Sequence, residues 1–265
     1  FEALSNINRW MELFLILIDQ LFESIVTSLE FRAAQLGITG FGIFQFSRCR
    51  SDRVGSICRN SVFQLRFNQV QNGFMTRFDQ FVFAELKSDG YDGLFLSNGP
   101  GDPSTMDSVV SLVRQALEEK MPIFGICFGH QLMAQAMGAT VAKADFGWGI
   151  GAKHYEIVEP QPWMDSTTDI VLAASHQDQV QSLPDGARLM ARAPYCPVGG
   201  MLIGDRAWTL QVHPEFSPAL ADSLLATRLA LFGEEKANAA RTTLSEPLDQ
   251  HRIAGWMANF FHQTS

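Results

Sequence analysis

The chain has 265 residues, enough for one large domain or two small ones, and 46% of them are hydrophobic, which is ample for a buried core. Its formal charge of −8 and the lack of a basic run argue against a nucleic-acid-binding surface. The spacing of Cys49, Cys58, Cys127 and Cys196 fits neither a zinc ribbon nor a dense disulfide framework, so we expect a reducing, cytoplasmic location and no metal site. The apolar run Leu13–Ile18 is too short to span a membrane.

The first 83 residues differ in composition from the rest of the chain, because they are rich in phenylalanine and arginine and contain no lysine. We expect a first strand ending at Asp19, a helix over 20–37 and a second strand over 41–46. Residues 47–80 show no clear period, so we expect them to be the least regular part. We therefore divide the chain into residues 1–83, the N-terminal part of the domain, and a core over 84–265.

From residue 84 onward, patterns typical of strands alternate with patterns typical of helices. The predicted strands lie at 91–97, 123–126, 169–175, 188–193 and 207–212. The predicted helices lie at 106–120, from His130 to about Gly138, at 217–232 and at 249–263. The segment 98–103 is a loop dense in turn residues. This alternation predicts an α/β fold, with helices on both faces of a mostly parallel central sheet.

Cys127 lies in the sequence Gly125-Ile126-Cys127-Phe128-Gly129, where the chain changes from strand to helix. This pattern is typical of a nucleophile elbow, because glycines on both sides let the backbone double back. The N–H groups at the helix start favour a thiolate, and the N–H of Phe128 can point at an oxyanion. A buried structural cysteine is the alternative, but the paired glycines favour the nucleophile.

His213 and Glu215 follow the strand over 207–212. Ligands of parallel α/β sheets bind beyond the carboxyl ends of the strands, where the loop over 98–103, Cys127 and His213 would meet. Residues two apart in extended backbone face the same way, so Glu215 can hold one imidazole nitrogen while the other faces a nucleophile. Singly, each residue fits an ordinary surface position; together with Cys127 they predict a Cys-His-Glu triad.

Three segments resemble class I glutamine amidotransferases: FLSNGPGDP at 95–103, PIFGICFGHQLMAQAMGA at 122–139 and QVHPEF at 211–216. Residues from about 84 to 145 look most like the small subunit of carbamoyl phosphate synthase. From Trp148 onward, the chain is more similar to stand-alone type 1 glutamine amidotransferases that are related to the glutaminase domain of GMP synthase. The resemblance implies a flavodoxin-like three-layer sandwich with the nucleophile elbow between a strand and a helix.

The resemblance also implies a role for each matching residue. Cys127 would be the nucleophile, His213 the base and acid, and Glu215 the residue that orients His213. The backbone N–H groups of Gly99 and Phe128 would form the oxyanion hole. The remaining implied residues would contact the substrate: Gly101, Gln131, Ser175, His176 and Gln177.

The reaction that the resemblance implies is hydrolysis of the side-chain amide of glutamine to glutamate and ammonia, through a cysteine thioester and without a cofactor. Three alternatives stay open. The same site could serve a γ-glutamyl peptide hydrolase, or a glutaminase subunit that is active only with a synthase partner on another chain. The third alternative is an inactive regulatory module. We expect neither nucleic acid nor a membrane as a partner.

Overall fold

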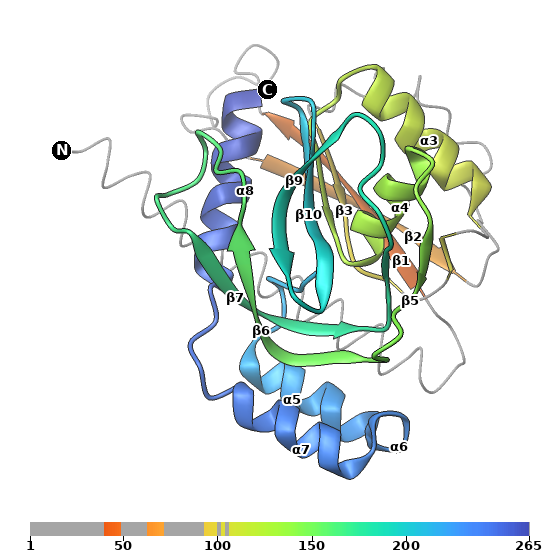
Figure 1. Ribbon diagram of the computed structural model, residues 1–265. Helices are drawn as coiled ribbons and strands as arrows, with labels where there is room; N and C mark the ends of the chain where they lie inside the picture. The colour runs from red at the N-terminus through yellow and green to blue at the C-terminus, as the bar shows by residue number, and fades with distance from the viewer. Residues whose placement is uncertain (1–39, 49–62, 72–92, 100–101, 104–105, 265) are drawn as a thin grey trace.

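The computed structural model describes residues 40–48, 63–71, 93–99, 102–103 and 106–264. They form an α/β fold, in which helices cover both faces of a nine-stranded sheet with the order β2-β1-β3-β4-β11-β10-β9-β6-β7 (Figure 1). A separate two-stranded sheet consists of β5 and β8. The strands are β1 Gly40–Arg48, β2 Phe63–Gln71, β3 Gly93–Leu96, β4 Ile123–Ile126, β5 Val141–Lys143, β6 Gly149–Ile157, β7 Asp169–His176, β8 Asp178–Val180, β9 Ala187–Ala193, β10 Cys196–Ile203 and β11 Ala207–Leu210. The helices are α3 Asp107–Glu118, α4 Phe128–Ala136, α5 Pro218–Thr227, α6 Leu229–Phe232, α7 Glu234–Thr243 and α8 Gln250–Thr264.

Parallel pairing occurs at the centre of the large sheet, where β4 lies between β3 and β11. The other neighbours in this sheet pair antiparallel. Helix α3 connects β3 to β4, and parallel neighbours require a crossover of this kind. The sheet is therefore mixed, and the predicted parallel arrangement describes its central strands, which carry the site.

Alternate residues of the central strands pack on opposite faces of the sheet. Leu94 and Leu96 of β3 belong to a core cluster with residues of α3 and α4, whereas Phe95 belongs to a cluster with residues of α8. Strand β4 divides in the same way, with Ile123 in the first cluster and Phe124 in the second. This period of two produces the three layers: α3 and α4, the sheet, and α8 (Figure 1).

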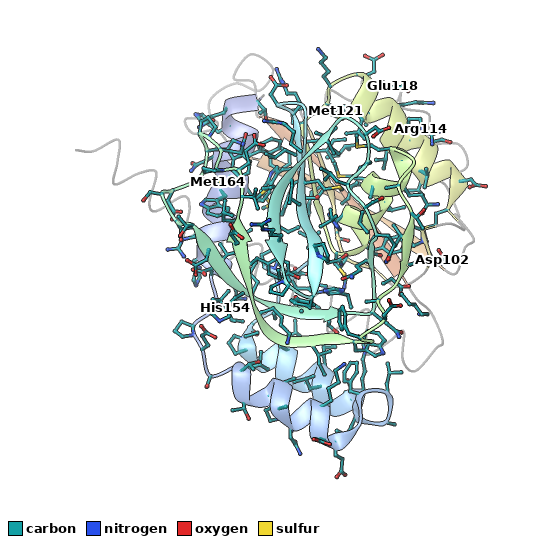
Figure 2. The ribbon with its side chains drawn as sticks, in the orientation of Figure 1. Asp102, Arg114, Glu118, Met121, His154 and Met164 are labelled. Carbon is teal, nitrogen blue, oxygen red and sulfur yellow. The ribbon has the colours of Figure 1, made fainter. Side chains whose placement is uncertain are left out.

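A hydrogen bond joins the two helices of the first layer. Arg114 of α3, labelled in Figure 2, donates from Nε to the carbonyl oxygen of Ala136 at 3.0 Å, at the end of α4. A second hydrogen bond stabilises the start of α5, where Ser217 accepts from the N–H of Leu220 at 3.2 Å. Among the helices that the structure describes, none combines the length and the apolar character needed to cross a membrane.

Helices α5 to α7 pack against β6 and β7 through a separate apolar cluster that includes Ala152, Val171, Leu224 and Ala237. The sequence predicted one continuous helix over 217–232. The structure divides it at Arg228, whose φ of −110° and ψ of 21° depart from helical values, so that α5 and α6 are two elements.

The N-terminal part confirms one prediction and adds a strand that was not predicted. The strand predicted over 41–46 is β1, which pairs with β3 and so extends the central sheet. Within residues 47–80, which we expected to be the least regular part, Phe63–Gln71 forms the additional strand β2. Its sequence FQLRFNQVQ begins with apolar and polar residues in alternation, which is a signal typical of a strand. The alternation is short, and the surrounding segment shows no clear period, so the sequence interpretation missed it. The first strand ending at Asp19 and the helix over 20–37 lie outside the described residues, and the division at residue 84 stays a prediction.

The packing of α4 on β3 predicts how two glycines differ in their tolerance of alanine. At Gly129 a Cβ would lie 2.3 Å from the carbonyl oxygen of Leu96, so Gly129→Ala should lower the free energy of unfolding by about 3 kcal/mol or prevent folding. At Gly138, φ is +88° but nothing lies within 4 Å, so Gly138→Ala should cost only about 1 kcal/mol of backbone strain. Urea unfolding followed by circular dichroism measures both, and equal losses would contradict the close packing at Gly129.

Candidate active site

Cys127 occupies a strained turn between β4 and α4. Its φ of 47° and ψ of −101° lie in a region that residues with a side chain rarely adopt, at a cost of about 1–3 kcal/mol. Hydrogen bonds on both sides hold this conformation. The N–H of Cys127 donates to the carbonyl oxygen of Leu210 at 2.8 Å, and its carbonyl oxygen accepts from the N–H of Gln131 at 3.0 Å. The sequence pattern therefore folds as the predicted elbow.

The two glycines of the elbow are required by different neighbours. A Cβ at Gly125 would lie 2.9 Å from Sδ of Met133 and 3.0 Å from the backbone of Gly129. A Cβ at Gly129 would enter the backbone of β3, as described above. The glycines thus let the elbow helix approach both the strand before it and the neighbouring strand.

His213 lies just beyond β11, and contacts on its backbone, edge and face hold it in place. Its N–H donates to the carbonyl oxygen of Ala173 in β7 at 2.9 Å. Nδ1 donates to Oε1 of Glu215 at 2.7 Å, and the two side chains are 0% and 3% exposed. The ring of Phe216 stacks on the imidazole with a centroid distance of 4.0 Å and an angle of 3° between the planes. Nε2 is the ring nitrogen that Glu215 does not hold, so it is the one left for a reacting group.

The charges around His213 favour its protonated form. Burial lowers the pKa of His213, but the negative charges of Cys127 and Glu215 outweigh burial and raise this pKa to about 10. Two other buried histidines lack such partners. Burial, with the charge of His213 added, lowers the pKa of His176 to about 3. Burial, with His176 added, lowers the pKa of His130 to about 3. Of these three buried histidines, His213, beside Cys127, is therefore the one that is protonated near neutral pH.

The second described cysteine, Cys196, has a different environment. It is buried at the start of β10, its Sγ donates to the carbonyl oxygen of Val198 at 3.7 Å, and burial raises the pKa of its thiol to about 12. Cys49 and Cys58 lie outside the described residues. No group of three or more His, Cys, Asp and Glu side chains in the described ranges gathers as ligands for a metal ion.

Gln131 and His176, both predicted to contact a substrate, converge on the segment after β7. Nε2 of Gln131 donates to the carbonyl oxygen of Asp178 at 2.8 Å, and Nδ1 of His176 reaches the same oxygen at 3.3 Å. The imidazole of His176 also stacks on Tyr195, with a centroid distance of 6.0 Å. The residues before and after His176 have different surroundings. The Oγ of Ser175 is buried and has no hydrogen-bond partner among the described residues. Gln177 lies at the surface, where its Oε1 accepts a hydrogen bond from Nζ of Lys143 at 3.3 Å.

The predicted oxyanion hole is described only in part. Gly99 is half-buried just after β3, and Phe128 is the first residue of α4, directly after Cys127. Their roles as oxyanion donors stay predictions. Gly101, predicted to let the loop approach the substrate, lies outside the described residues.

Gln211 is a site residue that the sequence interpretation missed. It is fully buried, and its Nε2 donates to Sγ of Cys127 at 3.6 Å. Its Oε1 accepts from Nε2 of Gln131 at 3.3 Å. The signal was its position two residues before His213, because β11 pairs with β4 in a register that aligns Leu210 with Ile126 and so brings the next residues together.

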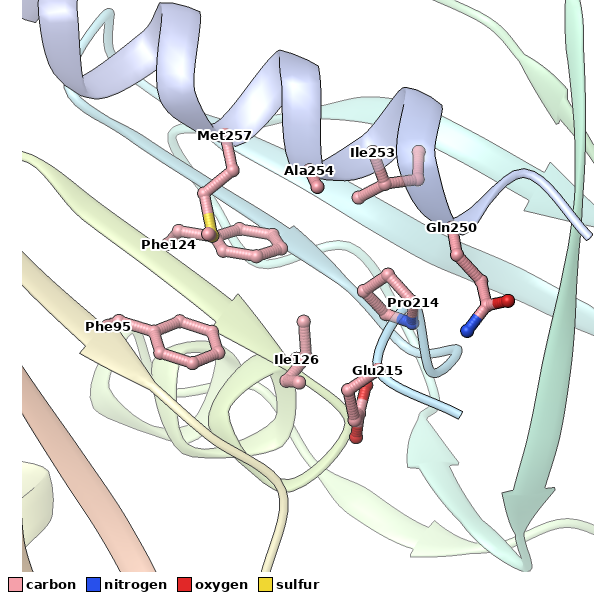
Figure 3. A pocket seen from close by; sticks show the side chains of 9 residues that line it. All are labelled: Phe95, Phe124, Ile126, Pro214, Glu215, Gln250, Ile253, Ala254 and Met257. Atoms are coloured by element: carbon pink, nitrogen blue, oxygen red, sulfur yellow. The ribbon is translucent and has the colours of Figure 1, made fainter. Parts of the chain in front are cut away.

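A cavity of about 40 Å³ lies on the α8 side of the sheet and reaches Glu215 (Figure 3). It is lined by Phe95, Phe124, Ile126, Pro214, Glu215, Gln250, Ile253, Ala254 and Met257. Cys127 is not among these residues, so the cavity lies behind the His213–Glu215 pair and not at the nucleophile. Oε2 of Glu215 is buried and has no hydrogen-bond partner within the described ranges. Its other oxygen binds His213, so the carboxylate contacts the triad histidine on one side and the cavity under α8 on the other.

Comparison with known proteins identifies the family and the fold of the chain. The sequence profile of the family described as glutamine amidotransferase class-I matches residues 54–230, which is more than half of the chain. The chain therefore belongs to the class-I glutamine amidotransferase family. Solved glutamine amidotransferases from Thermotoga maritima and Methylobacillus flagellatus share the fold. Their TM-scores are 0.55 and 0.51 at 18% and 19% identity; both alignments cover 66% of this chain, and 79% and 77% of the respective structures. The predicted α/β, flavodoxin-like class is confirmed.

The curated relatives include carbamoyl phosphate synthase small chains. The small chain from Zymomonas mobilis is 42% identical over 146 residues, which cover 53% of this chain and 37% of that protein. The small chain from Halomonas eurihalina is 39% identical over 138 residues, which cover 49% of this chain and 34% of that protein. The chain thus aligns with only about a third of the length of these relatives.

The raised pKa of His213 predicts its titration. A pKa above the usual 6.5 in the folded state means that protonated His213 stabilises the fold fully below about pH 6.5, and that this contribution is lost as the pH rises through about 10. Glu215→Gln removes one of the charges that raise the pKa, so the midpoint should fall. Histidine NMR over pH 5–11 measures both midpoints. A wild-type midpoint near 6.5, unchanged by Glu215→Gln, would contradict the charge pairing.

Proposed function

We propose that this class-I glutamine amidotransferase hydrolyses the side-chain amide of glutamine, with Cys127 as nucleophile and His213 as acid and base. The observation that carries the proposal is the pairing of an elbow cysteine with a buried imidazole. Cys127 interacts electrostatically with His213, and Glu215 holds the far nitrogen of that ring at 2.7 Å. A thiolate beside an imidazolium is the resting form that thioester chemistry needs.

The proposed reaction has two stages, formation and hydrolysis of a thioester. The Cys127 thiolate attacks the amide carbon of glutamine, and the carbonyl oxygen becomes an oxyanion. His213 gives its proton to the amide nitrogen, the C–N bond breaks, and ammonia leaves a γ-glutamyl thioester. Neutral His213 then takes a proton from water, the resulting hydroxide attacks the thioester, and the C–S bond breaks to release glutamate and restore the thiolate. Glu215 orients the ring and balances its charge without itself taking up the proton.

Other residues of the site would bind and stabilise the reacting groups. The N–H groups of Gly99 and Phe128 would hold the oxyanion, and one such donor is typically worth about a hundred- to a thousand-fold in rate. Both N–H bonds of Gln131 are engaged, with Asp178 and Gln211, so Gln131 would meet the substrate through its carbonyl oxygen. Further substrate contacts would come from Gly101, Ser175, His176 and Gln177.

A second candidate is a glutaminase subunit that supplies ammonia to a synthase on another chain. The relatives favour it, because those at 37–42% identity include small chains of carbamoyl phosphate synthase. In that case the site would release ammonia slowly until the partner docks. The chemistry at Cys127 would be the same, so the two candidates differ in the condition for activity and not in the reaction.

Ammonia release from glutamine and from γ-glutamyl dipeptides tests the proposal. Cys127→Ala should abolish it while the protein stays folded, and His213→Ala should lower it by about a thousand-fold or more, because the proton donor and acceptor is lost. Glu215→Gln should reduce it less, and Cys196→Ala, which leaves the triad intact, should keep it.

A diazo-ketone analogue of glutamine identifies the nucleophile independently and should label Cys127 alone. Labelling of Cys196, or full activity of Cys127→Ala, would overturn the assignment. Hydrolysis of dipeptides but not of glutamine would identify a γ-glutamyl peptide hydrolase. Activity that appears only when a synthase is added would favour the second candidate.

A further inference from the structure

Gln211 contacts the reacting atom of the site from the position just after β11, the strand beside the elbow. Its Nε2 lies 3.6 Å from Sγ of Cys127, and its side chain is inaccessible to solvent. We propose that Gln211 is a catalytic residue, whose amide N–H donates a hydrogen bond to the Cys127 sulfur and stabilises the thiolate over the thiol. This inference rests on Cys127 as the nucleophile of the proposed function and adds to the triad a donor that is not part of it.

The direction of the Gln211 amide is fixed by a chain of hydrogen bonds that starts at a backbone carbonyl. The oxygen of Asp178 can only accept, so Gln131 must turn its nitrogen toward that oxygen, at 2.8 Å. The second hydrogen of the same nitrogen meets Oε1 of Gln211 at 3.3 Å. With its oxygen engaged, Gln211 directs its nitrogen to Cys127. Rotating the Gln131 amide by half a turn would place its oxygen against other acceptors. Rotating the Gln211 amide would place its nitrogen against the nitrogen of Gln131, so that two donors would face each other.

An N–H group aimed at the sulfur acts differently on its two protonation states. A thiolate is a strong acceptor and a thiol is a weak one, so the hydrogen bond favours the charged form of the sulfur. Gln211 can give this bond without competing for the proton, because an amide does not titrate in this range. The bond lies on the side of Cys127 that faces the end of β11. It does not involve His213, which stays available to carry the proton.

The described ionisable groups around Cys127 leave a place for such a neutral donor. His213, beyond β11, is the charged partner, with Glu215 on its far side. Cys196 of β10 interacts with Cys127 and stays a thiol, because burial raises its pKa to about 12. His130 of α4 and His176 of β7 stay neutral, because burial lowers their pKa values to about 3. One cation therefore faces the sulfur, and Gln211 adds a dipole.

The pH dependence of Cys127 alkylation by iodoacetamide tests the inference on the full chain. Gln211→Met removes the donor, and Gln211→Glu keeps an oxygen for Gln131 but puts an acceptor against the sulfur. Alkylation of Cys127 at neutral pH should be roughly ten-fold slower in Gln211→Met than in the wild type. It should be slower still in Gln211→Glu. Gln181→Met is the matched control, because this exposed glutamine bonds to Ala142 and Gln179 and should leave the profile unchanged.

A measurement on the wild-type side chain covers the case in which a variant does not fold. With ¹⁵N-labelled glutamine, the side-chain amide signals of Gln211 should move as the pH is raised and lose this movement in Cys127→Ala. Alkylation profiles of Gln211→Met and Gln211→Glu that match the wild type would overturn the inference, and so would amide signals that ignore the thiol. Neither readout needs a substrate, so a chain that fails to hydrolyse glutamine refutes the proposed function while the role of Gln211 is still decided.

Discussion

The parallel pairing of β4 with β11 is the constraint on which the site depends. It aligns Ile126 with Leu210, so the N–H of Cys127 reaches the carbonyl oxygen of Leu210 and the strained turn is held at the end of β11. The residues that continue β11 then pass the sulfur in order, with Gln211 first and His213 two positions later. The bond from His213 to Ala173 closes the arrangement against β7. One strand end thus supplies the amide, the imidazole and the carboxylate, and a long loop is not needed to bring them to the nucleophile.

Electrostatics then distinguishes between three buried histidines that burial alone would treat alike. Burial disfavours the charged form of each, and it prevails at His130 and His176, whose pKa values fall to about 3. At His213 the neighbouring charges of Cys127 and Glu215 reverse the outcome and raise the pKa to about 10. The neighbouring charges, and not the degree of burial, therefore decide which imidazole carries the proton. The neutral histidines also serve the site, because a second cation beside His213 would oppose its charge.

The sequence predicted the parts of the site that are local and missed those that depend on register. An elbow is a strand, a turn and a helix in succession, and His213 and Glu215 are two residues apart, so short patterns were sufficient. Gln211 contacts Cys127 across 84 positions, and only the pairing of β4 with β11 brings the two together. The fold shows the same limit. Helix α7 has the sequence EEKANAARTT, which has no large apolar residue at helical spacing, and it packs through Ala237 and Ala240. Strand β2 lay in a segment without a clear period, and its short alternation went unrecognised.

The layer under α8 contributes to the site although it does not touch the sulfur. Apolar side chains such as Phe124, Ile253 and Met257 line most of the cavity behind Glu215, and the carboxylate side chain is only 3% exposed to solvent. A charge in such surroundings is tolerated only beside its counter-charge, so ionised Glu215 and protonated His213 depend on each other. Burial also strengthens the hydrogen bond between these two side chains and the bond from Gln211 to the sulfur. The apolar core that holds α8 on the sheet therefore also strengthens the effect of these two hydrogen bonds on the Cys127 thiol.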